Sequence, residues 1–259
     1  MTQSVTPLAL AVWARRFSTF INCGVSLVRC LEVLKHGSDE PLASITHQVQ
    51  EQVMAGETLS KAMAEHPNVF NRLSITLCRA GEVGGILDNT FAVWADWLER
   101  DLDLGARFDS YLLLAQLGPH PRSRQEVEAE LRAAMPDLEE RVREMTFCRI
   151  FGMMLGSGVP LLQALDVAAN EVFPEDGAER CRVLKQAVVE PPQLLAPGFR
   201  ELGFSPFAVQ LVATGEECGI LDRLMEKAAD LFQRELEVRM SAALAGLISP
   251  AAPAGDAPA

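Results

Sequence analysis

A phrase of eight residues occurs twice in this chain, at an offset of 134 positions. Residues 81–88 read Gly-Glu-Val-Gly-Gly-Ile-Leu-Asp, and residues 215–222 read Gly-Glu-Glu-Cys-Gly-Ile-Leu-Asp. A second phrase repeats at the same offset, because residues 23–27 read Cys-Gly-Val-Ser-Leu and residues 157–161 read Ser-Gly-Val-Pro-Leu. Two matched phrases at one offset predict a tandem duplication, so we expect two similar domains.

The composition indicates that both domains are helical. Hydrophobic residues make up 49% of the 259 residues, which is enough to fill two cores, and the chain contains one Tyr. Ala and Leu favour helix, whereas strands prefer β-branched and aromatic residues. We therefore predict an all-α fold of two tandem six-helix domains, related by internal duplication and joined by a partly helical linker.

Apolar residues at helical spacing, separated by Gly and Pro, place the helices along the chain. In the second copy the same plan recurs, except that Pro191, Pro192 and Pro197 predict the loss of the fourth helix and a loose segment over residues 190–204. The helices expected in the first copy cover residues 8–22, 26–36, 41–55, 58–66 and 70–80, with a long one from residue 88.

These elements define four segments. The first bundle is expected over residues 8–104 and the second over residues 139–242. The linker, 105–138, contains Ser123 and Glu126 at the spacing of a helix capping box. The tail, 243–259, is predicted to be disordered because its end is rich in Pro, Ala and Gly.

The net charge of −12 and the pI of about 4.8 restrict the class of partner. A negative field repels phosphate backbones and anionic lipid, so the chain is not expected to bind nucleic acid or a membrane surface. Two interpretations stay open: a basic protein partner, or an acidic surface that only keeps the protein soluble.

The sequence spells out no catalytic, metal or cofactor site. Six cysteines form no CxxC pair and lie mostly in apolar helical stretches, which is typical of buried, reduced thiols in the cytosol. The four histidines are scattered, and no nucleophile motif or phosphate-binding glycine loop occurs. No window of about 20 residues is free of charge, and residues 1–22 do not form a signal peptide. We predict no enzyme, no cofactor, no metal and no membrane span.

The repeated phrases contain residues suited to turns and residues suited to contacts. The glycines suit tight turns, the leucines suit core positions, and the aspartates suit a helix N-terminus. Glutamate has no evident turn-making role, so its repetition favours a contact with a partner. The predicted structural residues are Gly24, Gly81, Gly85, Leu87, Gly158, Gly215, Gly219 and Leu221, and the candidate partner-binding residues are Glu82, Asp88, Glu216, Glu217 and Asp222.

At these phrases the chain resembles the cytoplasmic domain of the type II secretion system F and type IV pilus assembly platform proteins. The family pattern has an aromatic-led first helix, a Gly-Val-x-Leu turn, a Gly-x-x-Leu-x-x-Ala stretch, a Phe, and Gly-Glu-x-x-Gly-x-Leu-Asp. The second copy lacks the Gly-x-x-Leu element and has Glu-Pro-Pro-Gln over residues 190–193. In the first copy the pattern falls on Phe17, residues 24–27, residues 56–62, Phe70 and residues 81–88, and in the second on Phe151, residues 158–161, Phe204 and residues 215–222.

The resemblance implies a six-helix bundle in each copy and a cytoplasmic bacterial platform component of a machine that assembles pilin-like fibres. Relatives follow each bundle with membrane-spanning helices, which this sequence does not show. The implied partners are an assembly ATPase or inner-membrane platform subunits, with attachment to the inner membrane through those partners. The alternative is a self-associating scaffold without ATPase coupling, for which Phe151, Met153 and Met154 are a candidate homodimer face.

Overall fold

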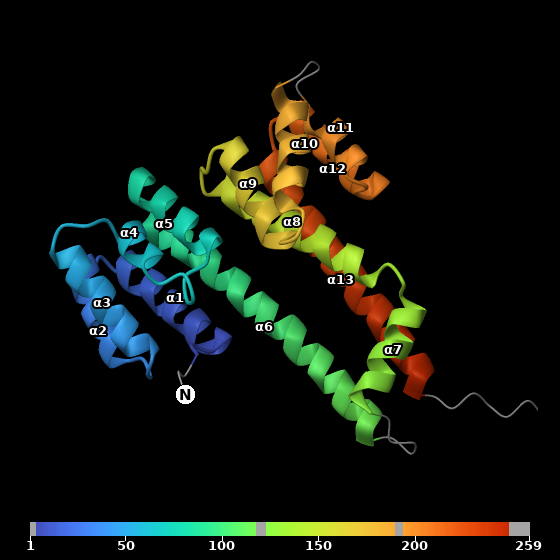
Figure 1. Ribbon diagram of the computed structural model, residues 1–259, viewed down its shortest axis with the longest axis horizontal. Coiled ribbons are helices and arrows are strands. Elements are labelled where there is room, and N and C mark those ends of the chain that lie inside the picture. Colours follow the sequence, from blue (N-terminus) through green and yellow to red (C-terminus); the bar gives the residue numbers. More distant parts are fainter. Residues whose placement is uncertain (1–3, 118–122, 190–193, 249–259) are drawn as a thin grey trace, which may run out of the picture.

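A computed structural model describes residues 4–117, 123–189 and 194–248, and these residues form thirteen helices and no strand. Figure 1 shows them as two helical bundles. The first copy contains α1 (Pro7–Asn22), α2 (Leu27–His36), α3 (Leu42–Met54), α4 (Leu59–Ala64), α5 (Arg72–Gly84) and α6 (Leu87–Leu117). The second contains α8 (Leu138–Gly156), α9 (Leu161–Val172), α10 (Gly177–Val189), α11 (Leu195–Glu201), α12 (Pro206–Cys218) and α13 (Leu221–Ile248), and α7 (Arg124–Ala134) lies between the copies.

The duplication is visible in the positions of the helices. Helices α2 and α9, α5 and α12, and α6 and α13 begin 134 residues apart. In each copy the first helix packs along the sixth, as α1 on α6 and α8 on α13. The prediction of an all-α fold built by tandem duplication is therefore confirmed.

An aromatic cluster forms the core of the first bundle. Phe17 and Phe91 are the closest pair, with ring centroids 4.1 Å apart. The indole Nε1 of Trp13 donates a hydrogen bond of 3.0 Å to the buried Oγ1 of Thr46, so this buried polar group is satisfied. The rings that touch in this cluster belong to Trp13, Phe17, Phe70, Phe91 and Trp94.

The second bundle has aromatic rings at three equivalent positions, and its helices α8 and α13 approach each other closely. Phe147, Phe151 and Phe204 correspond to Trp13, Phe17 and Phe70, and Phe147 lies 5.2 Å from Phe204. A Cβ added at Gly152 would lie 2.8 Å from the backbone nitrogen of Glu226, so α8 approaches the backbone of α13 directly. The two helices can pack closely because no side chain separates them at this point.

The face proposed for self-association is not exposed. Phe151 and Met154 are completely buried, and Met153 is 4% exposed. These side chains belong to the core of the second bundle because α8 contacts both α9 and α13. The prediction of a homodimer face at these three residues was wrong.

A fourth helix is present in the second copy, contrary to the sequence-based prediction. Helix α11 covers Leu195–Glu201 and includes Pro197 and Gly198. Pro197 is the third residue of α11, where a backbone N–H has no partner within the helix, so proline removes no helical hydrogen bond. The other prolines of that prediction, Pro191 and Pro192, lie outside the described residues.

Three further boundaries differ from expectation. Helix α5 continues through Gly84, so residues 81–84 are helical and the turn is shorter than predicted. Helix α13 continues to Ile248, so residues 243–248 are helical where disorder was predicted; residues 249–259 lie outside the described part. Helix α6 runs without a break across the boundary predicted at residues 104 and 105.

The two copies meet through α5 with α9 and through α6 with α13. Figure 1 shows α6 and α13 converging toward the end of the molecule where α7 lies, and α7 contacts both of them. The contact between α5 and α9 joins the fifth helix of one copy to the second helix of the other. A twofold axis would bring the same surface of each copy into contact. Because α5 and α9 are not equivalent helices, the copies are not related by a twofold axis at this contact.

An ion pair fixes the start of α8 to α13. The carboxylate of Asp137 accepts hydrogen bonds of 2.7 and 3.0 Å from the guanidinium of Arg239, and these bonds lower the pKa of Asp137 to about 2. In an unfolded chain the pKa of an aspartate is about 3.9. The pair therefore stabilises the fold fully above about pH 4 and loses its effect as the pH falls toward 2.

We predict that Arg239→Gln lowers the free energy of unfolding at pH 7 by at most about 1 kcal/mol, because the pair is about one-third exposed and screened by solvent. The difference from the unaltered chain should shrink between pH 4 and pH 3, measured by urea unfolding. Arg132→Gln, which removes a highly exposed pair with Glu139 at 4.0 Å, should show no such pH dependence. A difference at Arg239 that stays constant with pH would contradict this account.

Candidate functional site: the repeated hairpin

Each copy of the repeated phrase forms the turn between the fifth and sixth helices of its bundle. Gly85 and Gly219 have φ of 67° and 66°, the left-handed conformation that ends α5 and α12. The next backbone N–H groups, of Ile86 and Ile220, donate to the carbonyl oxygens of Gly81 and Gly215 at 2.9 and 3.0 Å. This is a helix C-cap that requires glycine at the left-handed position.

The first glycine of the repeated phrase has a different role, since Gly81 and Gly215 lie inside helices α5 and α12. A Cβ added at Gly81 would lie 3.1 Å from Cα of Leu87, and one added at Gly215 would lie 2.9 Å from Cα of Leu221. These glycines let the sixth helix begin directly against the fifth. Gly24 and Gly158, in the other repeated phrase, have φ of 78° and 77° in the turns after α1 and α8.

The leucines and aspartates that follow the turn lie in the first turn of the sixth helix. Leu87 and Leu221 are partly buried and pack against the core. Helices α6 and α13 begin at these leucines, so Asp88 and Asp222 are the second helical residues and do not occupy the N-cap position. Their charge still favours the positive end of the helix dipole.

The first glutamate of the phrase reaches across the bundle to the fourth helix. The carboxylate of Glu82 accepts hydrogen bonds from the backbone N–H of Leu59 at 2.6 Å and of Ser60 at 3.3 Å. It also accepts one of 2.5 Å from the hydroxyl of Ser60. Because Thr58 accepts from the N–H of Lys61, three of the four unpaired N–H groups at the start of α4 are satisfied.

The equivalent glutamate of the second copy, Glu216, has the same role. The carboxylate of Glu216 accepts from the backbone N–H of Leu195 at 2.5 Å and of Ala196 at 3.2 Å, at the start of α11. The residue at the N-cap of α11 is Leu194, which has no side-chain cap. Glu216 is therefore the side chain that caps α11, and the repeated glutamate has the structural role that the sequence did not reveal.

Among the five candidate contact residues, Glu217 differs from the rest. It is exposed and has no hydrogen-bond or ion-pair partner among the described residues, and Val83 at the equivalent position is 86% exposed. Glu82 and Glu216 are engaged within their own bundles, and Asp88 and Asp222 are partly buried. The structure does not gather the five residues, because the two phrases belong to different bundles (Figure 1).

The described residues contain no group of three His, Cys, Asp or Glu side chains placed to hold a metal ion.

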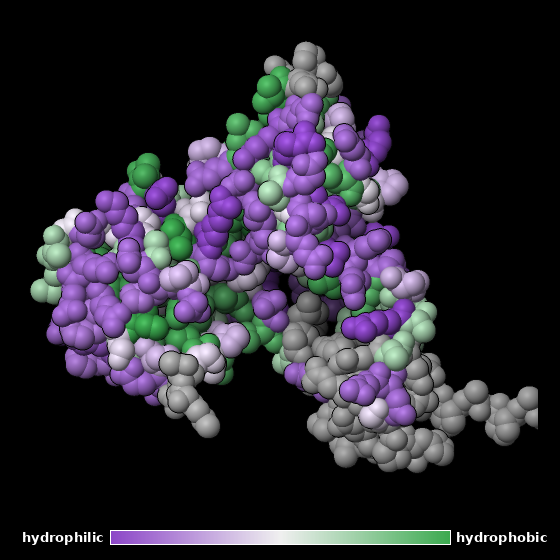
Figure 2. Space-filling view, in the orientation of Figure 1, coloured by the Kyte–Doolittle hydropathy of each residue, from purple (hydrophilic) through white to green (hydrophobic). Residues whose placement is uncertain are grey.

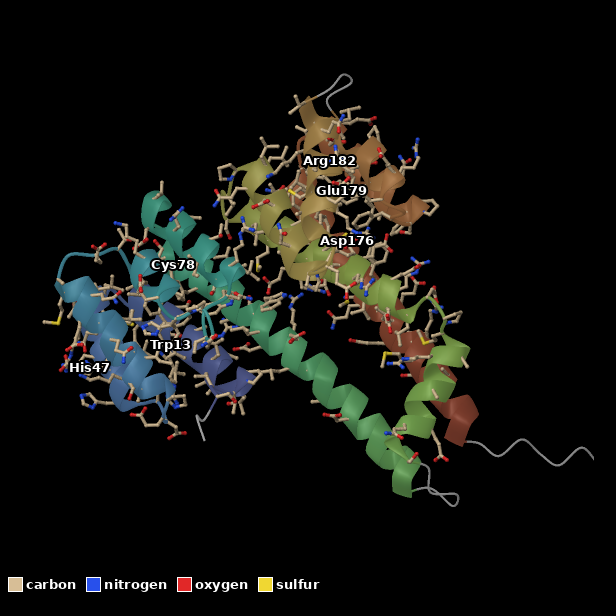
Figure 3. The ribbon with its side chains drawn as sticks, viewed as in Figure 1. Trp13, His47, Cys78, Asp176, Glu179 and Arg182 are labelled. Carbon is tan, nitrogen blue, oxygen red and sulfur yellow. The ribbon has the colours of Figure 1, made fainter. Side chains whose placement is uncertain are left out.

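A histidine and a cysteine that could be compared as a reactive pair, His47 and Cys78, lie apart. His47 is half exposed on α3 and lies 3.8 Å from Glu51, whereas Cys78 is buried on α5, and Figure 3 shows these two residues on separate helices. Burial raises the pKa of the Cys78 thiol, which keeps it protonated and unreactive. The prediction that the cysteine thiols are buried holds for four of the six cysteines, because Cys23 and Cys218 are exposed.

A cleft of about 330 Å³ lies beside α8 and the start of α12. Within its lining, Arg141 lies 3.3 Å from both Asp137 and Glu144, and Arg180 of the lining lies 2.7 Å from Asp176 nearby. Glu144 also accepts a hydrogen bond of 2.7 Å from the N–H of Ser205. The polar groups of this cleft thus connect elements of the second bundle.

In the parts of the chain that the structure describes, none of the helices combines the length and the apolar character that crossing a membrane requires. Figure 2 shows a surface that is largely hydrophilic on the face in view.

The sequence matches the model of the family described as "Type II secretion system (T2SS), protein F", over residues 13–114 and again over residues 147–254. The two matches begin 134 residues apart, which is the offset of the repeated phrases. Together they cover most of the chain.

Three similar proteins come from different bacteria. "Type IV pilus assembly protein PilC" of Myxococcus xanthus is 25% identical, over 93% of this chain and 74% of that protein. The protein of the same name in Thermus thermophilus is 24% identical, over 92% and 76%. "Type II secretion system protein F" of Xanthomonas campestris pv. campestris is 25% identical, over 93% and 76%. The alignment with the Myxococcus protein has 311 positions, more than the 259 residues here, so that protein carries residues within the aligned region that this chain lacks.

We predict that Glu216→Ala lowers the free energy of unfolding by about 1–3 kcal/mol, because two N–H groups of α11 lose a charged acceptor. Glu82→Ala should cost less, since Thr58 still caps α4. Glu217→Ala, one residue further along, is the matched control and should change stability by less than about 0.5 kcal/mol. Urea unfolding measures all three, and equal effects at Glu216 and Glu217 would contradict the capping role.

We also predict that Gly81→Ala lowers the free energy of unfolding by about 1–3 kcal/mol, because the new methyl group meets the backbone of Leu87. Gly84→Ala is the control, because its Cβ would meet only the side chain of Ile86, at 3.2 and 3.6 Å. Thermal unfolding should show a lower midpoint for the first variant alone. Equal midpoints would mean that the fifth and sixth helices can separate without loss.

Proposed function

Because the chain belongs to the type II secretion system protein F family, we propose that it docks to an assembly ATPase or to other platform subunits of a secretion or type IV pilus-like machine. In this proposal it acts as a non-enzymatic platform or adaptor component. It works at the cytoplasmic side of the inner membrane and attaches there through its partners.

The observation that carries the proposal is the family match to both copies of the duplication. Relatives that align with 93% of this chain are named "Type IV pilus assembly protein PilC" and "Type II secretion system protein F". Helix α7 contacts both α6 and α13, the sixth helices of the two bundles, so the two copies belong to one connected unit.

The acidic surface favours a partner with basic side chains. The contacts in the structure, however, change which residues are candidates for binding it. A charge reversal at Glu82 or Glu216 would release a helix N-terminus inside the bundle, so lost binding there would not identify a docking site. Glu217 is the candidate whose side chain faces solvent without a partner among the described residues. The binding of a partner to the acidic surface should depend on Glu217 and should weaken as the ionic strength rises.

We predict that a tagged form of this chain, isolated from its native cells at low salt, recovers an assembly ATPase or platform subunits, identified by mass spectrometry. High salt should reduce the recovery, because exposed ion pairs are screened. Glu217→Lys should reduce it several-fold at low salt. Glu175→Lys is the control, since it makes the same change of charge at an exposed position in the turn after α9.

Equal recovery with Glu217→Lys and Glu175→Lys would exclude Glu217 as the contact and leave docking to be mapped elsewhere. Recovery of this chain alone, at both salt concentrations, would contradict docking and favour a self-associating scaffold.

A further inference from the structure

Polar side-chain contacts between described residues join the two copies. Arg72, at the start of α5, forms an ion pair with Asp166 of α9. Beside it, the amide of Asn71 donates a hydrogen bond of 2.6 Å to the carboxylate of Glu171. Further along the molecule, Arg100 of α6 lies 2.9 Å from the carboxylate of Asp230 on α13. In each contact the first copy supplies the donor and the second copy supplies the acceptor.

Both aspartates have further cationic partners within the second copy. Asp230 accepts a hydrogen bond of 3.0 Å from Arg149 on α8 and lies 3.7 Å from Lys227. Burial alone would raise the pKa of Asp230, but the hydrogen bond and charge of Arg149, together with the charge of Arg100, outweigh it and lower that pKa. Asp166 lies 3.4 Å from Lys185 on α10. Each of these two carboxylates therefore has a cationic neighbour within its own copy, in addition to the arginine of the first copy.

The arginines of the first copy are more exposed than the carboxylates they meet. The side chains of Arg72 and Arg100 are 56% and 51% exposed, whereas those of Asp166 and Asp230 are 26% and 30% exposed. If the two arginines withdrew, each would enter water, and each aspartate would keep a cationic neighbour. Separation would therefore leave neither aspartate as a buried charge without a partner, which is the event that makes the loss of an ion pair costly.

Each copy has an aromatic core of its own. Among the described rings, every ring contact lies within one copy, as in the pairs of Phe17 with Phe91 and of Phe147 with Phe204. Figure 2 shows the copies as two masses that meet in the middle of the molecule. The aromatic packing of each bundle therefore does not depend on the contact between the copies.

We propose that the polar contacts between the two copies form an electrostatic latch. Arg72 and Arg100 of the first copy dock on preformed acidic sites at Asp166 and Asp230 of the second, and the two bundles separate when the arginines are displaced. High ionic strength displaces them by screening. A partner that presents basic side chains to the same two aspartates opens the latch by competition.

The chain carries a natural pair of labelling sites for the test. Cys23 in the first copy and Cys218 in the second are exposed, and the other four cysteines are buried. Fluorophores on these two thiols report the distance between the bundles in single molecules of the full chain. The double variant Arg72→Gln/Arg100→Gln removes both latch arginines. Arg182→Gln is the matched control, because it removes an exposed pair of 2.5 Å with Glu179 inside α10 (Figure 3).

At low salt, the unaltered chain and Arg182→Gln should give one narrow distance distribution, and the double variant should give a broader distribution shifted to longer distances. The unaltered chain should change in the same way between about 50 mM and 1 M NaCl. Circular dichroism should show unchanged helicity in all samples. A distance distribution that is the same in the double variant as in the unaltered chain overturns the latch. So does an unchanged distribution across the salt range, which needs no variant and is decisive even if the double variant fails to fold.

Discussion

The hydrogen bonds from a glutamate carboxylate to the N-terminus of the fourth helix hold each bundle together at its weakest element. Helices α4 and α11 have six and seven residues, too few to be stable alone. Each is fixed at its start by a carboxylate from the end of the fifth helix, Glu82 in one copy and Glu216 in the other. The turn that ends the fifth helix therefore also places the fourth.

This arrangement explains the repeated phrase residue by residue. The first glycine lets the sixth helix approach, the glutamate caps the fourth helix, and the second glycine adopts the left-handed conformation that ends the fifth. The leucine packs on the core, and the aspartate lies in the first turn of the sixth helix. Each of these five repeated residues acts within its own bundle, so folding accounts for their repetition without a partner.

The sequence predicted the features that depend on neighbouring residues. Apolar spacing predicted the helices, and the glycines predicted a turn between the fifth and sixth helices, although the fifth helix was expected to end at residue 80 and continues to Gly84. Features that depend on distant residues were missed: Glu82 and Leu59 are 23 positions apart, and no local pattern joins a carboxylate to a helix start at that separation. The prolines misled the prediction at α11 because their effect depends on the position within the helix, which periodicity does not fix at a short element.

The two copies have the same plan but different surfaces, and this bears on function in the machine. The equivalent of the exposed Val83 is the exposed Glu217, and the cations that reach across the joint, Arg72 and Arg100, both come from the first copy. At the offset of 134 positions, Arg100 corresponds to Arg234 and Asp230 to Asp96, whereas Arg72 corresponds to Pro206. The proposed docking at Glu217 and the Arg72 half of the proposed latch therefore depend on differences between the copies.

The most direct test of the capping account is amide hydrogen exchange at Leu59, Ser60, Leu195 and Ala196, compared between the unaltered chain and the Glu82→Gln and Glu216→Gln variants. The account predicts slow exchange at all four amides in the unaltered chain, with faster exchange at the first pair in the Glu82 variant alone and at the second pair in the Glu216 variant alone. Fast exchange at these amides in the unaltered chain, or no change in either variant, would contradict it.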